Sequence, residues 1–382
     1  MKRVNHIISL FFILLLFLTG CEDTGYPDII LITGTEESNT LNFSIEGPAS
    51  MGITVTASDV VPADTRVDLG VDPALIAGLN EQTGKNYVIL PDGSYNLSAG
   101  NVVIHAGTHV SDQVSLNITS TDDFEEGVNY CVPVTINGTN GSMPVLESSR
   151  TVFILVRKTI ITRAADLKKR NYFTVPSFVD NPDVAALPAL TMECRVYVNS
   201  FHSSNPYISS IIGIEERFLL RFGDVSIARD EIMLAGGEVA GAGKYQLAAT
   251  EKFSTGKWYH VAAVYTGSSM ALYIDGRMVT QTEAAQGVVD MSWDYAGGFH
   301  IGYSADGRKL DGYVSEARLW SKALTASQLQ ESLCYVDPTS QGLIAYWRFN
   351  GAEGRNVTDL TGHGHTAVAW EDIAWVEGVR CP

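Results

Sequence analysis

The sequence has little positive charge. Lys and Arg together number 26, against 43 Asp and Glu, which gives a formal net charge of −17. A chain this acidic repels the phosphate backbone of DNA and RNA, so no nucleic acid partner is expected. Long apolar runs are also scarce: the only one lies at the N-terminal end, and no second candidate for a membrane-spanning helix follows it.

Cysteine is scarce as well, with five residues in the chain. Their spacing contains no Cys-x-x-Cys pair, and no His-x-x-x-His pair suggests a zinc site. Cys334 and Cys381 bracket the C-terminal segment and are expected to form a disulfide in an oxidising compartment. Cys131 and Cys194 lie between apolar residues in strand-like runs, which favours buried free thiols.

The N-terminal apolar run predicts a lipoprotein signal peptide over residues 1–20. It follows two basic residues and has about a dozen apolar residues, too few to span a membrane. The run ends at Leu-Thr-Gly before Cys21, which resembles a bacterial lipobox, and Glu22 and Asp23 resemble the acidic export tag of Bacteroidetes surface lipoproteins. We expect lipidation at Cys21, a lipid-anchored linker over 21–35 and exposure at the outer-membrane surface. An ordinary secretory signal is the alternative.

Residues 36–158 carry short apolar runs separated by turn residues, which predicts an immunoglobulin-like β-sandwich. The expected strands are 41–45, 52–57, 65–71, 102–105, 114–120, 130–136 and 151–156, with one helical turn at 73–80.

Three spaced motifs in this segment identify a resemblance. They are Val-Asp-Leu-Gly-Val-Asp at 67–72, Tyr-Val-Ile-Leu-Pro at 87–91 and Gly-Val-Asn-Tyr-Cys-Val-Pro-Val at 127–134. Together they resemble the DUF1735 module of Bacteroidetes surface lipoproteins. The resemblance implies a spacer in a glycan context, because that module occurs beside lectin-like domains and beside glycosidases that act on N-glycans.

A linker is expected over 159–170, where Lys168, Lys169 and Arg170 form the densest basic run of the chain, interpreted as solvated. The second domain is expected over 171–382. Its clearest feature is a pair of strands, 257–265 and 270–274, followed by Asp-Gly, the sequence of a tight hairpin turn.

One helix start is predicted near the end of the chain, where Thr325 and Gln328 have the spacing of a capping box. The strand pair and this capped helix resemble laminin-G-like, concanavalin A-type lectin domains. The resemblance implies a jelly-roll sandwich that often binds sugars, so the expected fold class is all-β with two sandwiches. Segments 342–349 and 359–365 resemble a motif from the start of that fold, which predicts either a circularly shifted strand order or an added edge strand.

Several glycosidases share the concanavalin A-like sandwich, and they place two or three carboxylates at alternate positions of one strand. The adjacent pairs Glu215–Glu216 and Asp230–Glu231 would point to opposite faces, as would Asp311 and Glu316 unless a bulge intervenes. No nucleophile elbow or P-loop occurs. We therefore predict no catalytic residues and no enzyme, although carboxylates that meet across strands remain an alternative.

Sugars stack their apolar C–H face on exposed aromatic rings, so aromatics outside the strand motifs are the candidates. Trp293 and Tyr295 lie in a turn-rich segment, where packed loop anchors are the alternative. Trp258, Trp320 and Trp347 lie in strand motifs and are predicted to be core residues. The candidate carbohydrate-binding residues are Tyr207, Trp293, Asp294, Tyr295, Trp370 and Trp375.

Related domains often hold calcium (Ca2+), which needs several oxygen ligands. Asp275, Asp306, Asp311 and Asp359 are candidates, but none forms a recognisable loop signature, so the metal is left open. The resemblance implies a non-catalytic surface lipoprotein that captures an oligosaccharide, from host N-glycans or dietary polysaccharide, for a SusC/SusD-like uptake system. An atypical glycoside hydrolase on this scaffold and a protein-binding adhesin are the alternatives.

Overall fold

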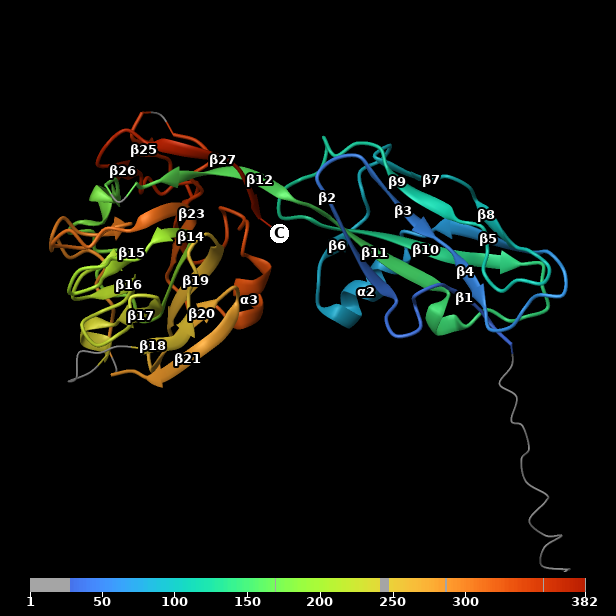
Figure 1. Ribbon diagram of the computed structural model, residues 1–382, viewed down its shortest axis with the longest axis horizontal. Coiled ribbons are helices and arrows are strands. Elements are labelled where there is room, and N and C mark those ends of the chain that lie inside the picture. Colours follow the sequence, from blue (N-terminus) through green and yellow to red (C-terminus); the bar gives the residue numbers. More distant parts are fainter. Residues whose placement is uncertain (1–27, 169, 241–246, 286, 353, 382) are drawn as a thin grey trace, which may run out of the picture. The chain divides into compact units, whose positions relative to one another are not determined.

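The structure is a computed structural model that describes residues 28–168, 170–240, 247–285, 287–352 and 354–381. The chain divides into two compact units, one up to Lys158 and one from Thr159 onward. Both consist mainly of β-strands (Figure 1), so the predicted all-β fold is confirmed. The predicted signal peptide and Cys21 lie outside the described residues. Within them, no helix has the length and apolar character needed to span a bilayer.

The first unit is a β-sandwich around one buried core. Its main sheet has the strand order β2-β11-β10-β5-β8, with β6 beside β10, and β3-β9-β7 and β1-β4 form two smaller sheets. The elements are β1 (Ile30–Ile32), β2 (Thr40–Ile45), β3 (Ala49–Ile53), β4 (Val55–Ala57), β5 (Thr65–Val71), α2 (Leu75–Thr83), β6 (Tyr87–Val88), β7 (Tyr95–Leu97), β8 (Asn101–Ile104), β9 (Val114–Ile118), β10 (Asn129–Thr139) and β11 (Thr151–Lys158).

Alternating apolar residues build this core. In β9, buried Val114, Leu116 and Ile118 alternate with less buried polar residues, so one face of the strand is apolar. On the opposite face of the main sheet, helix α2 packs Ile76 and Leu79 into a separate apolar cluster with Cys131 and Leu155.

Two predicted boundaries of the first unit are wrong. The predicted linker 21–35 includes β1, which is buried and pairs with β4. The predicted strand 52–57 is divided at Thr54, because β3 pairs with β9 whereas β4 pairs with β1. The alternating run 52–57 therefore belongs to two sheets. The position where it divides depends on the pairing partners β9 and β1, which are distant in sequence.

The second unit contains two eight-stranded sheets (Figure 1) that enclose a large apolar core. Sheet I has the order β21-β20-β19-β14-β23-β12-β27 with β24 beside β23, and sheet II has the order β18-β17-β16-β15-β22-β13-β26-β25. The elements are β12 (Ile160–Asp166), β13 (Phe173–Thr174), β14 (Leu190–Ser200), β15 (Ser209–Ile214), β16 (Phe218–Phe222), β17 (Glu231–Ala235), β18 (Leu247–Lys252), β19 (Trp258–Tyr265), β20 (Ser269–Ile274), β21 (Arg277–Glu283), β22 (His300–Ile301), β23 (Asp311–Trp320), α3 (Ala326–Glu331), β24 (Leu343–Trp347), β25 (Asn356–Val357), β26 (Ala367–Ala369) and β27 (Ala374–Cys381).

The predicted hairpin and helix start are confirmed. Strands β19, β20 and β21 pair in succession. The turn between β20 and β21 holds Asp275 and Gly276 at φ of 49° and 74°, the left-handed values that a tight hairpin turn requires. Helix α3 begins with the capping box of Thr325 and Gln328.

The predicted linker 159–170 is wrong, because residues 160–166 form β12. This strand pairs with β23 on one side and with β27 on the other, so it is an internal strand of sheet I. The second unit therefore begins at Thr159 and not at residue 171.

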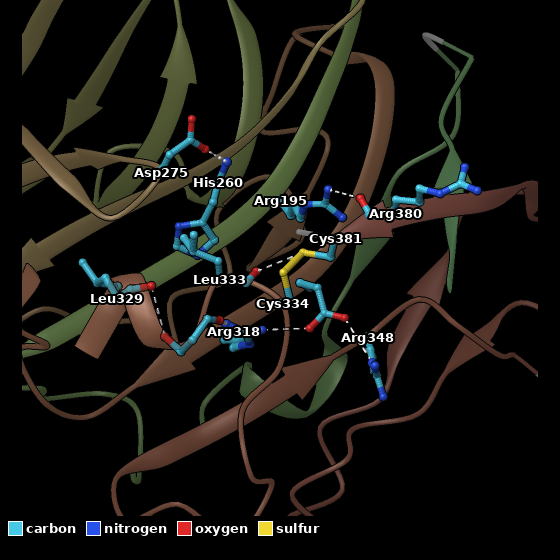
Figure 2. Close-up of a disulfide and its surroundings, with 12 residues drawn as sticks. Arg195, His260, Asp275, Arg318, Leu329, Leu333, Cys334, Arg348, Arg380 and Cys381 are labelled. Carbon is cyan, nitrogen blue, oxygen red and sulfur yellow. Dashed lines mark hydrogen bonds and ion pairs between the residues drawn. A yellow bond between two sulfur atoms is a disulfide. The ribbon is translucent and has the colours of Figure 1, made fainter. Parts of the chain in front are cut away.

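The C-terminal tail supplies edge strands to both sheets of this unit: β27 ends sheet I, and β26 and β25 end sheet II. Cys334, in the segment after α3, forms a disulfide with Cys381 at the end of β27, with the two Cα atoms 5.6 Å apart (Figure 2). The disulfide ties the edge strand to the segment that follows α3. Cys131 and Cys194 are buried free thiols.

Candidate binding surface

Trp293, Asp294 and Tyr295 lie in the segment before β22. The Trp293 ring stacks with Tyr295 at a centroid distance of 5.1 Å and an interplanar angle of 19°, and the Arg217 guanidinium lies 3.7 Å from its centroid. Trp293 is half-buried against the core, whereas Asp294 is exposed and Tyr295 is 41% exposed. Trp293 thus anchors the segment, and Tyr295 is the more accessible ring.

Trp375 and Tyr207 are separate from this pair. Trp375, on β27, packs against the core and is overlain by the Arg163 guanidinium, 4.3 Å from its ring centroid. Tyr207 is 39% exposed and has a left-handed φ of 65° directly after Pro206. Within the described residues, no ring stacks with Tyr207.

Trp370 is the most accessible of the predicted rings, with 57% of its surface exposed. It stacks on Tyr172, with ring centroids 5.5 Å apart and planes within 13° of parallel. Tyr172 in turn contacts Tyr303, at a centroid distance of 4.5 Å. These three residues, which we call the aromatic platform, form a continuous set of rings at the β13, β22 and β26 part of sheet II.

The backbone holds the platform in place. Strand β13 pairs with both β22 and β26, and the pairing continues past β26 because the Trp370 N–H donates to the Tyr172 carbonyl at 2.9 Å. Asn171 is buried, and its side-chain oxygen accepts from the backbone N–H of Tyr172 and of Glu371, at 3.0 and 2.9 Å. The side-chain amide of Asn171 donates to the Glu371 carbonyl. The rings are therefore fixed before any ligand arrives.

Polar groups surround the platform. The Lys309 ammonium lies 5.1 Å from the Tyr172 ring centroid, and Arg170 forms an ion pair with Glu371 at 2.7 Å. His300 contacts the rings of Tyr172 and Tyr303, and burial lowers its pKa to about 4, so the imidazole is neutral at pH 7. Hydrogen-bonding groups thus lie next to the apolar rings.

A second aromatic cluster lies on sheet I, where Tyr197, Trp258 and Tyr313 occupy paired positions of β14, β19 and β23. Tyr197 stacks with Tyr313 at 4.8 Å and contacts Trp258 at 5.6 Å. The prediction of Trp258 as a core residue is wrong, since its ring is half-buried on the face of the strand opposite to core residues such as Tyr259.

The carboxylates considered for catalysis are bound by basic side chains. Glu215 is buried between Arg221 and Arg308, at 3.1 and 2.9 Å. Lys252 contacts both Asp230 and Glu231, at 3.0 and 2.8 Å.

A bulge does intervene at Glu316, which has a φ of 51°, but this carboxylate is 1% exposed and is bound by Arg318 and Arg348, at 2.8 and 3.1 Å. The same buried network includes Glu193, which contacts His260 at 2.8 Å. Burial alone would raise the pKa of Glu193, but Arg318 and His260 lower it to about 2. Because Glu193, Glu316 and Arg318 are at most 1% exposed, this network is a structural arrangement that a ligand does not reach.

The four calcium candidates do not converge. Asp275 accepts from the backbone of His260 at 2.8 Å, and Asp359 accepts from the backbone of Tyr346 at 3.0 Å. Asp311 accepts from Ser200, whereas Asp306 lies 3.8 Å from Arg308. Within the described ranges, no group of three or more acids, histidines or cysteines could hold a metal, so these residues do not fit a calcium site.

Both units match known families. Residues 168–330 match the family model of the concanavalin A-like lectin/glucanases superfamily, and residues 25–143 match a model that describes an N-terminal domain. The second unit is therefore a concanavalin A-like domain, as the resemblance implied. No curated protein matches the sequence.

Among solved structures, a candidate carbohydrate-binding protein from Bacteroides ovatus is similar over 93% of this chain and 99% of its own, with 23% identity and a TM-score of 0.62. At this identity the similarity shows the fold. A two-domain protein of unknown function from Bacteroides fragilis is similar over 76% of this chain and 95% of its own, with 10% identity and a TM-score of 0.32.

Proposed function

We propose that this protein binds glycans without cleaving them, and that the aromatic platform is its binding site. The observation that carries the proposal is Trp370, which exposes more than half of its surface while stacked on Tyr172. An apolar ring of this size is normally buried, and an exposed one on a fixed support favours a ligand that covers it. The lectin-like fold and the carbohydrate-binding candidate among the similar structures support a glycan as that ligand.

The chemistry of the platform suits a sugar. The axial C–H groups of a pyranose pack on the face of an indole, and the hydroxyl groups of the sugar need donors and acceptors at the rim. Lys309 and the Arg170–Glu371 pair provide such groups beside Tyr172 and Trp370. Because the rings are already stacked, binding loses little side-chain entropy.

A non-catalytic role is favoured by the arrangement of acids. Hydrolysis of a glycosidic bond needs two carboxyl groups roughly 5 to 10 Å apart on either side of the bond. Glu371 beside the platform is bound by Arg170, and the buried acids Glu215 and Glu316 are bound by arginines. We infer that the platform holds the glycan and leaves cleavage to other proteins.

We further propose that the protein is anchored to the outer membrane by a lipid on Cys21 and is exposed at the cell surface. The first unit would act as a spacer, and a SusC/SusD-like transporter would receive the captured oligosaccharide. The lipobox-like sequence before Cys21 supports the anchor.

A glycan array tests the proposal, using the full chain with Cys21→Ala to prevent lipidation. We expect retention of intact glycan, reduced at least tenfold in Trp370→Ala because the stacking surface is lost. Trp258→Ala, in the sheet I cluster, is the matched control and should retain the glycan. Shortened ligands would favour the alternative function of a glycoside hydrolase. Absence of retention on every glycan would favour a protein-binding adhesin.

A further inference from the structure

Positive charge gathers beside the aromatic platform, although the chain as a whole has a net charge of −17. The basic run of the sequence leads directly into Asn171 and Tyr172, and its last residue, Arg170, is largely exposed. Lys309 joins it from the loop between β22 and β23, donating from its ammonium to the Arg170 carbonyl at 2.8 Å. Two cations thus flank the half-buried ring on which Trp370 stacks.

The ion pairs around the platform distinguish these cations. Arg170 is neutralised by Glu371 at 2.7 Å, and Arg308 by Glu215 at 2.9 Å with Asp306 further away. Lys309 pairs with no carboxylate in the part of the chain that the structure describes; its partners are a backbone carbonyl and the Tyr172 ring. An ammonium has three donors, so Lys309 keeps donors and a full charge for a ligand.

Other lysines over aromatic rings provide a comparison. Lys322 lies 4.9 Å from the Trp320 centroid, and Lys257 lies 4.8 Å from the Tyr259 centroid. In both cases the ring beneath the ammonium is buried, so the lysine covers a core residue. The ring beneath Lys309 belongs instead to the platform whose outer member is exposed.

We propose that the platform recognises a sugar that bears a carboxylate, such as a uronic acid, with Lys309 as its carboxylate contact. The sugar ring would stack on Trp370 while the carboxylate reaches the Lys309 ammonium. A charge-assisted hydrogen bond of this kind is stronger than a neutral one. The carboxylate of the ligand would also neutralise the charge of the Lys309 ammonium. This proposal rests on the proposed function, since it names the ligand class of the same site.

Paired glycans test the proposal. An array would carry oligogalacturonates, glucuronate-containing oligosaccharides and sialylated glycans, each beside its carboxyl-reduced form, so that only the charge differs. We expect the full chain to retain acidic members at least about threefold more than their reduced partners, with a preference that falls as salt is raised.

Lys309→Gln keeps a donor for the Arg170 carbonyl but removes the charge. It should abolish the preference, so that acidic members and their reduced partners are retained alike. Lys322→Gln removes a lysine in the same ring geometry and should keep the preference. Circular dichroism of both variants checks that the fold is intact.

The two proposals fail in different ways. Glycan retention that depends on Trp370 but is equal for acidic and reduced members would overturn the carboxylate proposal alone, as would a preference that survives Lys309→Gln. Absence of retention, or retention that ignores Trp370→Ala, would overturn the proposed function together with it.

Discussion

At the scale of a single residue, His300 beside the aromatic platform makes the free energy of unfolding depend on pH. Its ring centroid lies 5.7 Å from that of Tyr172 and 5.0 Å from that of Tyr303. Burial lowers the pKa of His300 from 6.5 to about 4. The unfolded chain therefore binds a proton between these values while the folded chain does not, so the free energy of unfolding falls as pH drops from 6.5 to 4.

We predict a loss of about 3 kcal/mol from His300 over this window, measured by urea unfolding at several pH values. His300→Gln should flatten the slope. Part of the slope should remain, because burial also lowers the pKa of His365. The exposed His363 provides the control His363→Gln, and equal slopes for both variants would contradict the prediction.

The sequence predicted one of the three residues of the aromatic platform. Trp370 was among the predicted candidates, but Tyr172 and Tyr303 were not, since each lies beside a strand of only two residues. Only the pairing of β13 with β22 brings them together, and no local pattern reports that pairing. Trp258 could have been found, because the alternation of β19 places it opposite the buried Tyr259.

Among the elements, α3 offers a local test. Thr325 accepts from the Gln328 backbone N–H at 3.3 Å, and the Gln328 side chain accepts from the Thr325 backbone N–H at 3.0 Å. Leu329 of this helix packs against Trp320 in the cluster that covers sheet I. Thr325→Ala should destabilise the second unit by about 1 kcal/mol, measured by denaturant unfolding.

Ser327→Ala is the control for α3, since Ser327 is exposed on the same helix and its side chain donates to Glu331, at the end of that helix. Its effect should stay within about 0.5 kcal/mol, as for most surface substitutions. An equal loss in both variants would mean that the cap contributes nothing of its own.

The elements also explain which parts of the fold could be predicted. The β19–β20–β21 meander and the capping box were identified because their turns and caps use neighbouring residues. Strand β12 was taken for a linker because it leads into the basic run at 168–170, which suggested solvent, and its partners β23 and β27 lie far away in the sequence. Local chemistry therefore predicts turns and caps, whereas membership of a sheet depends on distant pairing.

For the whole molecule, the division into two units has a spectroscopic consequence. All six tryptophans lie in the second unit, as does the Cys334–Cys381 disulfide, which closes a separation of 47 residues. Tryptophan fluorescence therefore reports unfolding of the second unit alone, whereas far-ultraviolet circular dichroism reports both. In the chain-entropy view, a loop of this length stabilises by about 4 kcal/mol.

We predict that reduction moves the fluorescence transition to lower denaturant and leaves a second transition, seen by circular dichroism only, where it was. The units would unfold independently because each encloses its own core. Cys334→Ser should reproduce the shift without reductant, and Cys131→Ser, a change to a buried thiol of the first unit, should move only the other transition. A single transition that moves as a whole would show instead that the two cores unfold cooperatively, so that each unit contributes to the stability of the other.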